Sequence, residues 1–130
     1  MTSQGTAYGR FLRAMQRGQL FHAELAAREL GRLTLADALA LALLIADAEP
    51  ERWPRAAARW HARFVLEAKG IGLDESALAF AAVVALRGKH RELAAQTLRQ
   101  LARSRGLASF DDVLEQACLE RRIPSPTPGE

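Results

Sequence analysis

The sequence predicts an all-α fold, and three observations support this. Short motifs mark helix starts: "TLAD" at 34–37 and "SFDD" at 109–112 each place a capping hydroxyl three residues before a carboxylate. No stretch shows the apolar and polar alternation of a strand between hairpin turns. Five glycines end apolar stretches that carry a basic residue near their end, as expected where a left-handed glycine closes a helix and a cation meets its dipole. They are Gly18, Gly31, Gly70, Gly88 and Gly106.

These signals predict seven helices along the chain. In order they span residues 6–17, 20–30, 35–48, 51–69, 74–87, 89–105 and 110–122. Pro50 suits the first turn of the fourth helix, but Pro54 would then lie four residues inside it, so we expect this helix to begin nearer Trp53. Prolines follow the seventh helix. We therefore expect one domain over residues 1–122 and a mobile, proline-rich tail over 123–130.

Periodicity divides the predicted helices into inner and outer ones. Helices 35–48 and 74–87 are apolar on every side, which predicts a central position. Helices 89–105 and 110–122 carry a single apolar stripe and are predicted to be outer. The architecture expected is a compact single-domain bundle of about six to seven helices. A short stack of helical hairpins is the alternative, because glycine stops recur every 36 to 39 residues between 31 and 106.

We also expect truncation of side chains on the two central helices to destabilise the protein. Truncating Leu43 or Val84 to alanine should cost about 1 to 5 kcal/mol of stability, which is the range for buried aliphatic side chains.

Composition limits the compartment and the chemistry. The 130 residues include a single cysteine, Cys118, which allows neither an internal disulfide nor a site with several thiolate ligands and suits a reducing compartment. The first ten residues lack an apolar signal core, and the apolar run "ALALALLIA" at 38–46 is too short to span a bilayer. We expect a cytoplasmic protein without a membrane segment.

No residue pattern indicates catalysis. His22, His61 and His90 have no second ligand at metal-binding spacing, and Cys118 lies in an apolar stripe, as an inert core thiol does. The acidic residues cluster in predicted first helical turns, where they complement the helix dipole. The sequence therefore predicts no catalytic, metal or cofactor site, no small-molecule ligand and no enzyme.

The arginines are the remaining candidates. The chain has 16 arginines against two lysines and a net charge of +3. In "RWPRAAARWHARF" at 52–64, the arginines and the aromatic residues fall on two separate faces of a helix. A solvated surface from arginine-rich composition is one interpretation. The other is a partner-binding surface, for which the candidate residues are Arg52, Arg55, Arg59, Arg63, Arg99 and Arg103.

Two functional hypotheses follow from a binding surface. The first is a small interaction, adaptor or regulatory protein whose basic face contacts an acidic protein partner or a second copy of the chain. The alternative is a nucleic-acid accessory protein that holds phosphates without sequence preference. Bases would stack on exposed aromatic residues, but Trp53, Trp60 and Phe64 are predicted to point away from the arginines. This placement favours the protein partner.

Overall fold

A computed structural model describes residues 3–122 and, within them, the side chains of residues 5–119. All regular structure in this part of the chain is helical, which confirms the predicted fold class. The predicted tail lies outside the described residues. The helices are α1 (Ser3–Gln16), α2 (Leu20–Leu30), α3 (Leu35–Ala48), the short 3₁₀ helix η1 (Pro50–Arg52), α4 (Trp53–Glu67), α5 (Leu73–Ala85), α6 (Arg91–Ser104) and α7 (Asp111–Arg122).

Local signals explain several helix ends. The Thr34 hydroxyl caps α3 by accepting a hydrogen bond from the Asp37 backbone N–H at 3.1 Å. Helix α4 begins at Trp53, as the two prolines predict. Four of the five glycine stops adopt the expected left-handed conformation. Gly88 is the exception: its N–H closes a turn onto the Ala85 carbonyl without a positive φ, so the prediction of a left-handed cap was wrong there.

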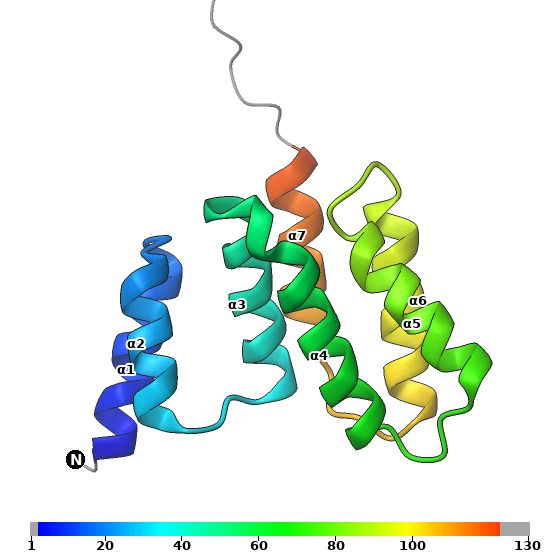
Figure 1. Cartoon of the computed structure of the whole chain (residues 1–130), viewed down its shortest axis with the longest axis horizontal. Helices are drawn as coiled ribbons and strands as arrows, with labels where there is room; N and C mark the ends of the chain where they lie inside the picture. Colours follow the sequence, from blue (N-terminus) through cyan, green and yellow to red (C-terminus); the bar gives the residue numbers. More distant parts are fainter. Residues whose placement is uncertain (1–2, 123–130) are drawn as a thin grey trace, which may run out of the picture. The chain divides into compact units, whose positions relative to one another are not determined.

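Contacts divide the chain into two compact units, which meet in the sequence between Leu66 and Glu67. The first unit contains α1 to α4, except for the last residue of α4, and the second contains α5 to α7. Within each unit, successive helices run antiparallel (Figure 1). The single domain expected from the sequence stays a prediction.

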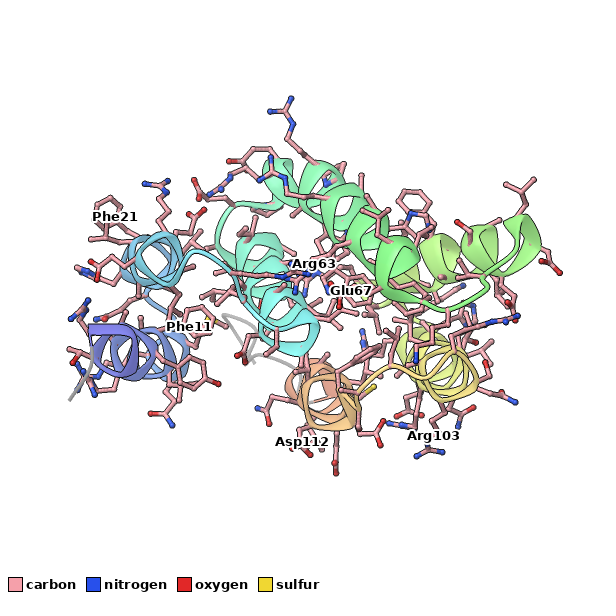
Figure 2. All side chains as sticks on the ribbon, turned by 90° about the horizontal axis from the view of Figure 1, so that it is seen from below. Phe11, Phe21, Arg63, Glu67, Arg103 and Asp112 are labelled. Atoms are coloured by element: carbon pink, nitrogen blue, oxygen red, sulfur yellow. The ribbon has the colours of Figure 1, made fainter. Side chains whose placement is uncertain are left out.

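In the first unit, small residues bring α1 and α2 together. Phe11 and three alanines, at 14, 23 and 26, form a buried cluster. In Figure 2, Phe21 points away from the pair while Phe11 lies on its inner side. Helix α3 has no exposed residue between Leu35 and Ala46, so each of these positions is at least partly buried, as its all-round apolar pattern predicts. The Leu35 carbonyl also accepts a buried hydrogen bond from the Trp60 indole at 2.9 Å, which links α3 to α4.

The second unit corrects two predictions. Helix α5 buries only one face, through Ala79, Ala82, Val83 and Leu86, whereas Val84 is 45% exposed. The central position predicted for this helix is therefore wrong, and the large cost expected for Val84→Ala no longer applies. Helix α6 packs against both α5 and α7, and its opposite side, with Glu92, Gln96 and Gln100, is exposed as its single apolar stripe predicts. An apolar helix surface is buried only where a neighbour covers it, and within this unit α6 provides such cover on one side of α5 alone.

Candidate binding surfaces

Helix α4 separates its aromatic residues from its arginines as the sequence predicts. Trp60 is 3% exposed and Phe64 is fully buried, with their ring centroids 5.4 Å apart. Arg55 and Arg59 are exposed on the other side of the helix. Trp53 is half-buried. The aromatic pair therefore anchors α4, and the two exposed arginines stand on a helix that packing holds in place.

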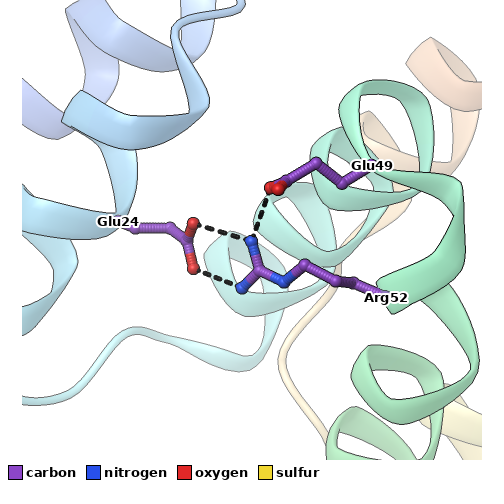
Figure 3. Close-up of polar contacts among 3 residues, drawn as sticks. All are labelled: Glu24, Glu49 and Arg52. Atoms are coloured by element: carbon purple, nitrogen blue, oxygen red, sulfur yellow. Dashed lines mark hydrogen bonds and ion pairs between the residues drawn. The ribbon is translucent and has the colours of Figure 1, made fainter.

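Arg52 belongs to an ion-pair network inside the first unit (Figure 3). Its Nη1 and Nη2 atoms donate to the two carboxylate oxygens of Glu24 at 3.0 and 2.7 Å, and Nη1 also donates to Glu49 at 2.7 Å. The hydrogen bonds from Arg52 lower the pKa of Glu24 below its ordinary value, although burial opposes the change. The same bonds raise the pKa of Arg52. This arginine joins η1 to α2 and is engaged within the chain.

Arg63, the remaining candidate arginine of the segment 52–64, is half-buried and already interacts with another residue. The four arginines predicted to share one helix face thus differ in environment. Arg55 and Arg59 are the exposed members of this group and lie four residues apart. Neither makes an ion pair with any of the described residues. We call these two residues the α4 arginine pair.

Arg99 and Arg103 lie on α6 in the second unit, and both bind Asp111 at the start of α7. Arg99 Nε donates to Asp111 Oδ1 at 3.0 Å, and Arg103 Nη2 donates to Oδ2 at 3.3 Å. Figure 2 shows Arg103 on the outer side of α6. Burial raises the pKa of Asp111, but hydrogen bonds from Arg99 and Ser109 and the charges of both arginines outweigh this and lower the pKa overall. These arginines attach the first turn of α7 to α6.

Charge is distributed unequally between the units. The first has nine arginines against six acidic residues and so carries the whole net charge of +3, while the second has nine basic and nine acidic residues. The α4 arginine pair therefore belongs to the basic unit. Its Arg10 and Arg52 pair with Glu29 and Glu24, respectively, so part of this charge is neutralised locally.

Sequence reasoning missed an exposed apolar row on α5. Leu73 is 91% exposed, and Ala77, Phe80 and Val84 are also exposed. The positions are separated by four, three and four residues, which places them on one side of a helix. We call these four residues the α5 apolar stripe. Its spacing was readable in the sequence, but the apolar residues on the opposite side of the helix concealed it.

Neither a family model nor a curated protein nor a solved structure matches the chain. Within the described residues, no helix combines the length and apolar character needed to cross a bilayer. The same residues contain no group of three or more histidine, cysteine or acidic side chains arranged to hold a metal ion.

Proposed function

We propose that this chain is a non-enzymatic interaction protein that binds an acidic surface of another protein through the α4 arginine pair. The observation that carries the proposal is the state of Arg55 and Arg59. Both are exposed and without an ion pair among the described residues, and they project from a helix whose opposite face is anchored by buried Trp60 and Phe64. Because packing holds this helix in place, binding through the two arginines costs less conformational entropy.

The spacing of the pair suits carboxylates. Four residues along a helix correspond to about 6 Å, so each guanidinium can meet a separate carboxylate presented one turn apart on a partner helix. Arginine binds carboxylates through two parallel hydrogen bonds, which adds geometric selectivity to the charge. The bidentate contact of Arg52 with Glu24 shows this geometry elsewhere in the same unit.

The alternative partner is nucleic acid, which the basic sequence pI of about 9.7 favours. Two observations argue against a nucleic-acid partner. The rings of Trp60 and Phe64 are buried, so this helix offers neither for stacking with bases. Arg52, Arg99 and Arg103 bind carboxylates within the chain, which leaves fewer arginines available for phosphates.

The test compares three versions of the full chain as bait in a nuclease-treated lysate, with captured proteins quantified by mass spectrometry. The first is the parent and the second carries Arg55→Gln and Arg59→Gln. The third carries Arg13→Gln and Arg17→Gln, a matched control because these exposed arginines, one in the last turn of α1 and one just after it, are also four residues apart. We expect an acidic protein that the first and third retain and the second loses.

Affinity measurements on the recovered protein complete the test. The α4 double variant should bind at least about tenfold more weakly than the parent, with a shallower dependence on salt. Equal capture by all three baits would refute the proposal. An interaction that appears only in lysate without nuclease, or that random duplex DNA competes away, would replace the proposal with the nucleic-acid alternative.

A further inference from the structure

Exposed apolar side chains form a row along one side of α5. Single exposed leucines are common on protein surfaces, but a row along a helix at heptad-like spacing is typical of a helix that packs against another helix. Leu73, Ala77, Phe80 and Val84 form such a row over almost the whole length of α5. The buried face of the helix, with Ala79 and Val83, lies on its other side.

We infer that the α5 apolar stripe binds the same stripe of a second copy of this chain, with the two helices antiparallel. Side-chain sizes support this choice of occupant. In an antiparallel pair of stripes, Leu73 of one copy faces Val84 of the other at each end. At the two central positions, Phe80 of one copy faces Ala77 of the other. Each large ring therefore meets a small residue. A parallel arrangement would instead oppose ring to ring and alanine to alanine, which gives a crowded layer beside a poorly filled one.

Charge at the helix ends supports the same orientation. Asp74 is exposed in the first turn of α5, and Lys89 is exposed just beyond its last turn. An antiparallel pair brings the acidic end of one helix to the basic end of the other and also opposes the two helix dipoles. The second unit carries equal numbers of basic and acidic residues, so two copies of it meet without net repulsion.

The size of the contact predicts a weak dimer. Stable interfaces bury about 800 Å² on each partner, whereas a seam of four positions on one helix, two of them alanine and valine, supplies much less. Self-association should therefore depend on concentration in the upper micromolar range. It does not rest on the proposed function, because the α4 arginine pair takes no part in the stripe.

Disulfide cross-linking tests the orientation. Two full-length variants are made on a Cys118→Ser background, one with Leu73→Cys and one with Val84→Cys. An antiparallel pair brings position 73 of one copy opposite position 84 of the other, so mixing the two variants under mild oxidation should give a covalent dimer, while each variant alone should give little. Leu78→Cys is the control, because Leu78 is 51% exposed on the same helix but about a third of a turn from the stripe.

Light scattering over a concentration series measures the association itself. The Leu73→Gln, Val84→Gln variant should raise the dimer Kd at least about tenfold, while Leu78→Gln and the α4 double variant should dimerise like the parent. Far-UV circular dichroism confirms that each variant folds. A mass that stays at 14.2 kDa for the parent up to about 0.5 mM overturns the inference. So does cross-linking of each single-cysteine variant with itself as efficiently as in the mixture.

Discussion

Replacing a leucine in the middle of α3 should destabilise the protein far more than replacing a leucine at the end of α4. Leu39 is fully buried, and Leu66 is 85% exposed. Leu39→Ala removes three buried carbons, worth about 2.4 kcal/mol in transfer free energy, and the cavity left behind brings the total to about 2.5 to 5 kcal/mol. Leu66→Ala loses only about 0.4 kcal/mol of transfer free energy, because most of this side chain is already exposed. The higher helix propensity of alanine offsets part of this loss.

Urea unfolding followed by circular dichroism at pH 7 measures both changes against the parent. If the urea concentration at the unfolding midpoint falls while the m-value, the slope of the unfolding free energy against urea, stays constant, the variant has changed stability and not the compactness of the denatured state. Leu39→Met keeps the volume of the side chain and should cost less than about 1.5 kcal/mol, which gives a folded reference if the alanine variant does not fold. The reasoning is refuted if Leu39→Ala and Leu66→Ala differ by less than about 1 kcal/mol.

The remaining predictions concern charge and caps. Because Arg52 lowers the pKa of Glu24 in the folded state, the parent should be more stable than Glu24→Gln above pH 4.5. This difference in stability should disappear as the pH falls through the lowered pKa of the folded state, which urea unfolding at pH 7 and pH 3 measures. Gly31→Ala should cost about 1 kcal/mol because its φ is 82°, whereas Gly88→Ala should be near neutral. Thr34→Ala removes the hydroxyl that caps α3 and should cost about 1 kcal/mol, and a neutral result in the same assay would contradict this role.

The helices were predictable because their boundaries depend on local chemistry. A capping hydroxyl such as that of Thr34 accepts a bond from a residue three positions later, and a left-handed glycine closes the turn directly before it. Both signals lie within a few residues and need no knowledge of the tertiary structure. Gly88 shows the limit of this reasoning, because a glycine after an apolar stretch can also close a turn in an ordinary conformation.

Burial was only half predictable, since the apolar patterns of α3 and α5 are alike. Both are apolar on several sides, but α3 packs against α2 and receives the Trp60 side chain from α4, whereas Val84 and Leu73 on α5 remain exposed. Periodicity reports which residues are apolar and does not report how many neighbours a helix has. A helix that is central and a helix that binds a partner therefore give the same pattern.

The candidate arginines show a similar limit for charge. The Glu24 and Arg52 partners are 28 residues apart, and Arg99 and Asp111 are 12 residues apart, so only the fold brings each pair together. The sequence placed the arginines on helix faces but gave no signal of which ones the chain neutralises itself. Three of the six candidates are engaged in this way, and Arg63 also interacts with another residue. The α4 arginine pair is what remains exposed without an ion pair among the described residues.

The two proposed surfaces differ in chemistry, and salt should separate them. Binding through Arg55 and Arg59 depends on exposed charges, which salt screens over about 10 Å at 0.1 M and about 3 Å at 1 M. Pairing through Leu73 depends mainly on the removal of apolar surface from water, which sulfate strengthens. Raising sodium sulfate should therefore weaken capture of the acidic partner while it leaves the dimer Kd unchanged or lowers it. If the dimer dissociates as salt rises, the charges of Asp74 and Lys89, and not the apolar stripe, hold the two copies together.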